Sequence, residues 1–544
     1  MGGEVDALFV GYESQENLGL RYIMAYLERQ GFSSRLVAFR DQEPERVVAA
    51  AREFSPKLIG FSILFQYTLA EFRTVMQLLR GAGIAAHFTA GGHFPTLRPE
   101  QVLSELPELD TVVRFEGELT TKELLEHLRN PEQWCRILGL AFRNPDRVVV
   151  NAPRALVSRL DDLPWPVRDH NPTVVRGIRV ATMLASRGCH FDCSFCSIRQ
   201  FYGGAPGPLR RARSPNDVVA EMHHLYEQSG VRVFVFHDDD FAVKTQRQRK
   251  WIESFLRNLD QAGLSDRIVW KISCRADDVD HDILARCRDR GLVSVYVGIE
   301  SGHPAGLATL NKRCTVEQNM AALLTLKDLG LAYDMGFMLI DPDTTVEGFR
   351  ANLRFLREVA DLGGVPISFA KAMPLAGTAL ERRLLEAHRL TGTATRPDYD
   401  LLDPRMDALA LFVTLHYSFR NSDPRGLVER LRAAWFDHTL AQTFESGDWI
   451  VAYQHALADI TDRADLVALD TLDRLTAFVA DLPPTMEAVA SNWEHLNTIV
   501  GREHDEERAI AADLARVLHT FSSGLCDTFS LQDAAMPEHD YVYT

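Results

Sequence analysis

Short β-rich runs alternate with amphipathic helical stretches in two separate parts of the chain, and this alternation constrains the fold more than any other feature. The first series covers about residues 5–128 and the second about residues 174–386. Strands separated by helices of about 10–15 residues are typical of βαβ units, which build parallel sheets. The first series therefore predicts a doubly wound, Rossmann-like sheet. The second has six strand candidates instead of eight, so it predicts a partial (β/α)6 barrel of the TIM type.

These patterns define an α/β fold and divide the chain into four parts. We expect a doubly wound domain over residues 1–130, a connector over 131–175, the partial barrel over 176–386 and a helical domain over 387–544. The proline-marked run 163–166 belongs to the connector, since such runs interrupt regular elements. After the barrel the β pattern fades and apolar residues recur at helical spacing, which predicts a C-terminal α-helical domain.

Composition narrows the classes of function. The 544 residues include 46% hydrophobic and 25% charged residues and carry a formal net charge of −16, the balance of a globular protein. Binding of nucleic acid is not expected, because phosphate contacts need clustered Lys and Arg. A membrane span is not expected either, because no apolar run reaches about 18 residues. The N-terminus lacks a charged region followed by an apolar one, and we therefore expect a cytoplasmic protein.

Three of the eight cysteines fall within eight residues, as Cys189-x3-Cys193-x2-Cys196, just after the first strand of the second series. Thiolates at such spacing indicate a metal site more than a packed core. A structural zinc site needs four ligands, and His190 is a conceivable fourth, but the chain has no second CxxC pair. An iron–sulfur cluster held by three cysteines leaves one iron open to an outside ligand. We favour the iron–sulfur cluster.

This cysteine motif resembles that of the radical S-adenosylmethionine (SAM) superfamily. In that family three cysteines hold a [4Fe–4S] cluster, the fourth iron chelates SAM, and reduction cleaves SAM to a 5′-deoxyadenosyl radical. The resemblance implies that Cys189, Cys193 and Cys196 are the metal ligands. Later segments resemble those that approach the cluster and SAM, which implies cofactor-binding roles for Phe195, Asp238, Asp239, Ser273, Arg275 and Glu300. The charged members of this set also have structural interpretations, as ion pairs or helix caps.

A doubly wound domain before such a barrel resembles the cobalamin-dependent branch of this superfamily. Ligands of doubly wound sheets lie beyond the carboxyl ends of the strands. In the first series those ends carry glycines and short polar residues, which let a ligand approach the backbone. The resemblance implies that the corrinoid is bound by Ser14, Glu16, Gly19, Ser62, Gly91, Gly92, His93, Glu116, Gly117 and Glu118.

One departure from the family pattern concerns the cobalt ligand. Many cobalamin domains carry Asp-x-His-x-x-Gly, whose histidine ligates cobalt from below. Aligned on Gly19, this chain has Glu16 at the histidine position. A carboxylate is a poorer donor to cobalt than imidazole, so we predict cobalamin bound base-off, with no histidine beneath the metal. His93 is the nearest alternative ligand.

The resemblance implies a cobalamin-dependent radical SAM methyltransferase. One SAM would methylate the cobalamin, and a second would supply the radical that activates an unreactive carbon of a small specialised metabolite. Cyclisation, ring rearrangement or sulfur insertion without methyl transfer are alternatives that share the same cofactor contacts, and a corrinoid or iron–sulfur sensor is a non-enzymatic one. Methylthiotransferases are disfavoured, because residues 1–134 contain no cysteine for a second cluster. The chemistry implies a reductant such as flavodoxin or ferredoxin, and no individual catalytic residue is assigned.

Overall fold

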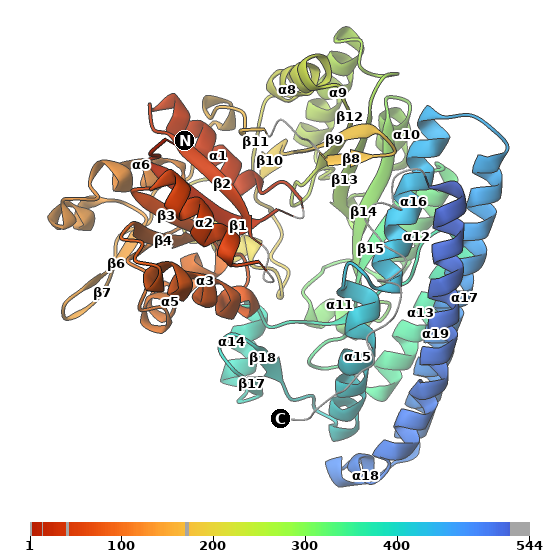
Figure 1. Ribbon diagram of the computed structural model, residues 1–544. Helices are drawn as coiled ribbons and strands as arrows, with labels where there is room; N and C mark the ends of the chain where they lie inside the picture. The colour runs from red at the N-terminus through yellow and green to blue at the C-terminus, as the bar shows by residue number, and fades with distance from the viewer. Residues whose placement is uncertain (1–2, 14, 40–42, 169–172, 523–544) are drawn as a thin grey trace.

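The computed structural model describes residues 3–13, 15–39, 43–168 and 173–522, and it has three parts (Figure 1). An N-terminal doubly wound domain lies beside a partial barrel, and long C-terminal helices pack along the far side of the barrel. This arrangement confirms the predicted α/β fold class with a helical C-terminal part. No helix in the described ranges is long and apolar enough to cross a membrane.

The N-terminal sheet is built from strands that are buried apolar runs, as expected where helices cover both faces of a parallel sheet. The strands are β1 (Ala7–Tyr12), β2 (Ser34–Phe39), β3 (Leu58–Ser62), β4 (His87–Gly91), β5 (Thr111–Val113), β6 (Leu140–Asn144) and β7 (Arg147–Val150). Their order is β2-β1-β3-β4-β5-β6-β7, and the last two form an antiparallel hairpin that pairs with β5. Part of the expected connector thus extends this sheet.

Helices cover both faces of the N-terminal sheet and create two cores. One face carries α1 (Leu18–Arg29) and α6 (Glu118–Glu126), and the other carries α2 (Glu45–Phe54), α3 (Leu69–Gly81) and α5 (Pro99–Glu105). The chain order reverses between β1 and β3, and sheets of this order bind ligands beyond the carboxyl ends of the strands at that switch point.

The second sheet is an open half-barrel whose strands follow one another in sequence order. Six parallel strands and one antiparallel edge strand form it, namely β8 (Thr173–Val175), β9 (Ile178–Met183), β12 (Val231–Phe236), β13 (Val269–Arg275), β14 (Leu292–Glu300), β15 (Ala332–Ile340) and β16 (Ala370–Lys371). The outer face is covered by α8 (Pro215–Ser229), α9 (Gln246–Gln261), α10 (His281–Arg288), α12 (Val316–Asp328) and α13 (Val346–Leu362).

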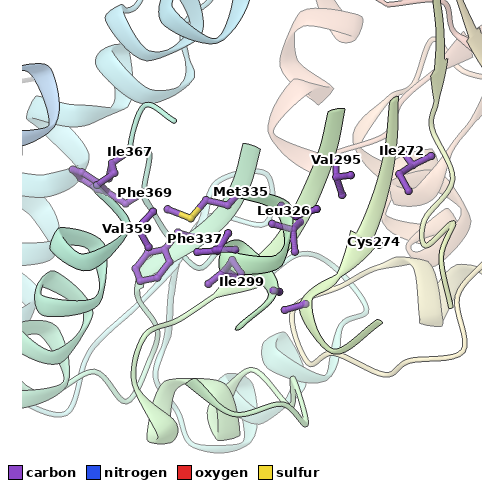
Figure 2. Close-up of a cluster of buried hydrophobic side chains, with 14 of the residues drawn as sticks. Ile272, Cys274, Val295, Ile299, Leu326, Met335, Phe337, Val359, Ile367 and Phe369 are labelled. Carbon is purple, nitrogen blue, oxygen red and sulfur yellow. The ribbon is translucent and has the colours of Figure 1, made fainter. Parts of the chain in front are cut away.

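The outer face of this sheet forms the main hydrophobic core of the protein. Leu326 of α12 and Val359 of α13 lie among strand side chains such as Ile272 and Met335 (Figure 2). Cys274 belongs to the same core and is 5% exposed. Because strand residues alternate between faces, the neighbours of these core residues along each strand face the inner, concave side.

The C-terminal part begins with α14 (Ala379–Glu386) and a short hairpin, β17 (Leu390–Gly392) and β18 (Pro397–Tyr399), which the helical periodicity does not predict. Five helices follow in the described residues: α15 (Pro404–Ser422), α16 (Leu427–Phe444), α17 (Trp449–Asp481), α18 (Met486–Ala490) and α19 (Trp493–Phe521). Of these, α17 packs against α13, and α16 lies against the inner side of the half-barrel. There Phe436 and Leu440 of α16 join a small apolar cluster with Val180, Val233 and Val269.

Two leucines of α12 test the importance of the outer core. Leu326 is fully buried, whereas Leu324 on the same helix is 48% exposed. We expect Leu326→Ala to destabilise the protein by about 2–5 kcal/mol, because it removes buried apolar surface and leaves a cavity. Leu324→Ala should change stability by no more than about 0.5 kcal/mol. Urea unfolding followed by circular dichroism measures both, and equal midpoints for the two variants would contradict the packing described.

Candidate active site

The three predicted metal ligands lie on one loop at the carboxyl ends of the barrel strands. Cys189, Cys193 and Cys196 lie between β10 (Ser186–Arg187) and α7 (Ile198–Gly203), and all three thiols are free and partly buried. The middle of the loop is fixed by backbone hydrogen bonds of Ser194: its N–H donates to Leu310 (2.9 Å), and its carbonyl accepts from Leu380 (2.8 Å). The loop is therefore held in place by two distant segments, one that follows α11 (Pro304–Thr309) in the barrel and one in α14.

A glycine and two aspartates hold the start of this loop. Gly188 has a φ of +84°, and a Cβ there would lie 1.8 Å from the Leu209 carbonyl oxygen, so only glycine fits. Its N–H donates to the Asp239 carboxylate (2.9 Å). Asp238 accepts from the Ala185 N–H (2.9 Å) and from the Ser186 hydroxyl. Both aspartates, which the resemblance assigns to cofactor binding, thus shape the cysteine loop directly.

The surroundings of the thiols suit a bound cationic cluster. Burial raises the pKa of Cys189 and of Cys196 to about 12, and the neighbouring Asp239 carboxylate adds to both shifts. Iron would stabilise the thiolate forms that burial disfavours. Within the described residues, no three His, Cys, Asp or Glu side chains are grouped to hold a single metal ion.

Arg275 and Glu300, two further predicted cofactor residues, end the adjacent strands β13 and β14. The Arg275 guanidinium donates to Cys193 Sγ (3.2 Å), pairs with Asp277 (2.9 Å) and lies 3.7 Å from the centroid of the Phe191 ring. Glu300 has a φ of +69° and pairs with Lys312 (3.2 Å between Oε1 and Nζ). Arg275 is thus in direct contact with a predicted cluster ligand.

The two remaining predicted SAM-site residues lie in different surroundings. Ser273 lies on the inner face of β13, and its carbonyl accepts a hydrogen bond from the Phe241 N–H (2.9 Å). Phe195, inside the cysteine motif, packs against the main hydrophobic core. Its ring therefore helps to anchor the cysteine loop to the barrel.

One cavity of about 480 Å³ lies between the two sheets, at the switch point of the N-terminal domain. This volume is in the range of cofactor pockets. The N-terminal strands contribute backbone and small side chains at their carboxyl ends, and the barrel contributes Leu184, Ser186, Arg187, His237 and Asp239. The segments that flank the cysteine loop and the doubly wound domain therefore line the same cavity.

Nearly all of the predicted corrinoid-binding residues line this cavity. They are Glu16, Gly19, Ser62, Gly91, Gly92, His93, Glu116, Gly117 and Glu118, whereas Ser14 lies outside the described residues. A Cβ on Gly19 would meet only Asn17 Oδ1, at 3.5 Å, so the backbone there is open to a bound group. Gly92, with a φ of +107°, approaches the Ile63 carbonyl so closely that a Cβ would lie 2.4 Å from it. Gly19 therefore leaves the backbone open to a bound group, whereas Gly92 is needed for close packing within the domain.

Glu16, at the position of the expected cobalt ligand, is engaged by the barrel. Its carboxylate accepts hydrogen bonds from the N–H and the hydroxyl of Thr182 (2.8 and 2.7 Å) and from Arg168 (2.7 Å). Arg168 also pairs with Glu221 (2.7 Å). Glu16 therefore joins the two domains in addition to lining the cavity.

Glu116 and Glu118 are likewise held by arginines of the barrel. Arg187 of β10 pairs with Glu116 (3.0 Å) and Glu118 (2.8 Å), and Arg211 pairs with Glu116 (2.9 Å). Burial alone would raise the pKa of Glu116, but Arg187 and Arg211 outweigh it and hold that pKa below its ordinary value. We call Arg187, Arg211, Glu116 and Glu118 the domain-locking cluster. The resemblance implies corrinoid binding for Glu116 and Glu118, and both line the cavity. Their ion pairs with the barrel arginines do not follow from the sequence.

His93 lines the cavity on the side of the cysteine loop. Its Nδ1 lies 2.9 Å from the hydroxyl of Ser197, directly after Cys196, and its ring stacks on Phe201 with 4.4 Å between centroids. Burial lowers the pKa of His93 to about 4, so the imidazole is neutral at physiological pH. His93 thus connects the cavity-lining segment after β4 to the end of the cysteine motif.

Fold and site together define a two-cofactor protein, in which a doubly wound domain and a three-thiol half-barrel share one cavity. The family models agree: residues 9–125 match the B12 binding domain, and residues 183–356 match the Radical SAM superfamily.

The chain is also similar to curated relatives and to a solved structure. An uncharacterised methyltransferase of Pyrococcus horikoshii is 29% identical over 394 residues, covering 72% of this chain and 82% of the relative. The anaerobic magnesium-protoporphyrin IX monomethyl ester cyclase of Cereibacter sphaeroides is 29% identical over 310 residues, 55% of this chain and 49% of that protein. The structure of OxsB, a cobalamin-dependent SAM radical enzyme with aqua-cobalamin bound, superposes with a TM-score of 0.67 at 16% identity, covering 96% of this chain and 80% of that one. The chain therefore carries a B12 binding domain followed by a domain of the Radical SAM superfamily, the combination expected of a cobalamin-dependent radical SAM enzyme.

The domain-locking cluster can be tested by removing its central cation. Arg187→Leu would leave two buried carboxylates short of a partner, and we expect it to cost about 3–5 kcal/mol of stability. Arg286→Leu is the matched control, because Arg286 is 46% exposed and pairs with Glu253 on the surface, and it should cost no more than about 1 kcal/mol. Chemical unfolding compares them. A loss at Arg187 as small as that of the control would show that the cluster does not hold the domains together.

Proposed function

We propose that this enzyme C-methylates an unactivated carbon of a small specialised metabolite. The single observation that carries the proposal is the shared cavity, which is lined both by the carboxyl ends of the doubly wound sheet and by the residues around the cysteine loop. A substrate in that space would face both cofactors. The methyltransferase relative from P. horikoshii supports the proposed reaction class.

When bound, the cluster and SAM would supply a carbon-centred radical, and the corrinoid would supply the methyl group. The residues of the chain have positioning roles. Cys189, Cys193 and Cys196 would hold the cluster, and Arg275 would hydrogen-bond to one of its sulfur ligands. Asp239 orients the cysteine loop through Gly188. The domain-locking cluster closes the cavity on one side, which limits access of water to reactive species.

A radical cyclisation without methyl transfer is the second candidate. It is favoured by the cyclase relative from C. sphaeroides, which is as similar in identity as the methyltransferase relative over a shorter stretch. Either reaction needs an external one-electron reductant such as flavodoxin or ferredoxin, and a cytoplasmic location would provide one.

We also propose that the cobalamin is bound base-off without a histidine ligand. The Glu16 carboxylate is occupied by Thr182 and Arg168. The His93 ring is fixed by its contacts with Ser197 and Phe201. Both residues thus have structural partners that account for their positions without a bond to cobalt.

The cofactor assignment predicts separable losses on mutation. We expect anaerobically reconstituted protein to bind cobalamin and, with SAM and a strong reductant, to form 5′-deoxyadenosine. Cys193→Ala should abolish 5′-deoxyadenosine formation and keep corrinoid binding, because Cys193 lies on the barrel loop. Cys135→Ala, at an exposed thiol, should leave both unchanged. Absorbance reports the corrinoid and mass spectrometry reports the nucleoside; 5′-deoxyadenosine without bound corrinoid would refute the role of the N-terminal domain.

A methyl-transfer assay separates the two candidate reactions. SAM carrying a deuterated methyl group should transfer three deuterium atoms to the product if a methyl group is transferred. A product without deuterium and lighter than its substrate would favour cyclisation. Pools of small metabolites serve as substrates, and the mass shift identifies the product.

The axial-ligand proposal predicts a spectrum. The Co(II) form should show no nitrogen hyperfine splitting in electron paramagnetic resonance, because neither dimethylbenzimidazole nor histidine would bind cobalt. Protein grown with ¹⁵N-histidine distinguishes the two nitrogen sources. A splitting that changes with this label and disappears in His93→Ala would identify His93 as the ligand and contradict the proposal.

A further inference from the structure

The inner face of the half-barrel carries a lysine below the level of the cysteine loop. On β13, Ile272 and Cys274 point into the outer core, so Lys271, Ser273 and Arg275 face the concave side. Arg275 reaches the cysteine loop. Lys271 comes four residues earlier, which is about 13 Å along a strand. The lysine therefore lies deeper in the half-barrel than the predicted cluster.

The register of the sheet places Lys271 near the shared cavity. Lys271 pairs with Val235 of β12, and His237 follows two residues later. The positive charge of Lys271 contributes to the lowered pKa of His237, after the larger effect of burial, so the two side chains are neighbours. His237 itself lines the cavity. A molecule that enters the cavity past His237 would meet Lys271 next.

Lys271 has no counter-ion of its own among the described residues. The acidic groups near it, Asp334 and Glu429, both pair with Arg432 of α16, at 3.0 Å for Asp334. The same guanidinium donates to the Ser368 hydroxyl. In the described part of the chain, no hydrogen bond or ion pair is formed by the Lys271 ammonium, and burial lowers its pKa. The Asp334 and Glu429 carboxylates are thus already paired with the Arg432 guanidinium.

The space beside Lys271 is open on the inner face. Tyr296, on the neighbouring strand β14, is 37% exposed although its strand is central in the sheet. Its hydroxyl lies over Gly336 of β15, where a Cβ would be 2.4 Å away. The apolar contacts of α16 with Val180, Val233 and Val269 close only the deeper end of the sheet. Lys271 lies between this closed end and the cavity.

We propose that Lys271 binds an anionic group, a carboxylate or a phosphate, of the enzyme's substrate and sets how deeply the substrate enters the half-barrel. This inference rests on the proposed function, because it assumes that the substrate occupies the shared cavity. The partly buried Lys271 ammonium forms no ion pair within the described residues, and an anionic substrate group would supply a partner. His237, neutral beside it, offers a further polar contact. Lys271 would be a binding residue that positions the reacting carbon.

The test measures the reactivity of Lys271 itself, in the wild-type holoenzyme. Trace acetic anhydride acetylates all amines in competition, and peptide mass spectrometry gives the rate at each lysine. The probes are acetate, inorganic phosphate and the neutral amide acetamide. We expect acetate or phosphate to slow acetylation of Lys271 by roughly tenfold at about ten times the dissociation constant. Acetamide should have no effect, and Lys327, on the surface of α12, should react equally with every probe.

Each outcome decides one part of the inference. Protection by acetate identifies a carboxylate site, and protection by phosphate alone identifies a phosphoryl site. Equal acetylation of Lys271 with all three probes would overturn the proposal. The cofactor assay is independent: if 5′-deoxyadenosine and bound corrinoid are found while Lys271 is not protected, the anion site fails and the proposed function stands.

Variants provide a second measurement. Added acetate or phosphate should raise the melting temperature of the wild type and of Lys271→Arg, because both carry a positive charge at this position. Lys271→Met should lose that anion-dependent shift, whereas Lys327→Met should retain it. Once a substrate is known, Lys271→Met should raise the KM for that substrate by about tenfold or more, because one charge-assisted hydrogen bond is lost. Lys271→Arg keeps the charge and should show a smaller increase in KM. A shift that persists in Lys271→Met would place the anion elsewhere.

Discussion

The ion pairs of Arg187 determine how the two cofactor-binding domains face each other. Arg187 lies two residues before Cys189, and its guanidinium binds both Glu116 and Glu118 at the end of the last parallel strand of the doubly wound sheet. The position of the predicted cluster is thereby linked to the wall of the shared cavity through one side chain. Buried ion pairs stabilise little after desolvation, but removing one partner is costly. The cluster therefore favours one arrangement of the domains over others.

Three further residues connect the doubly wound domain to the rest of the chain. Glu16 crosses to Thr182 on the first barrel strand, and His93 crosses to Ser197 at the end of the cysteine motif. Gln66, on the loop after β3, accepts from the Ala376 N–H (2.6 Å) and donates to the Ala394 carbonyl (3.2 Å) of the C-terminal hairpin region. All three start from loops at the carboxyl ends of the doubly wound sheet. The loops that form the binding site of this sheet therefore also hold the barrel in place.

Much of the fold and part of the site could be predicted from the sequence, because the signals are local. Strand and helix periodicity predicts both sheets, and the cysteine spacing places the three thiols on one loop. The sequence predicts that Glu16, Glu116 and Glu118 lie at the binding site, but it does not predict their contacts with the barrel. The partners, Thr182, Arg187 and Arg211, are 69 to 166 residues away along the chain. The strand pairing that brings Lys271 beside His237 is likewise a tertiary property. The hairpin of β17 and β18 was missed because its two strands have only three residues each.

The overall acidity of the chain and the cationic site inside it have different consequences for binding. A net charge of −16 repels anions. This repulsion is largely screened beyond about 8 Å at physiological ionic strength, so it does not prevent an anion from reaching the protein. Inside the half-barrel Lys271 is partly buried, and its ammonium acts on a bound anion at short range, where salt screens the attraction less than in bulk solvent. Anion selection at Lys271 would then depend on contact and depth of entry, and less on the rate of encounter. Such a site would favour substrates whose anionic group and reacting carbon are separated by the distance from Lys271 to the cofactors.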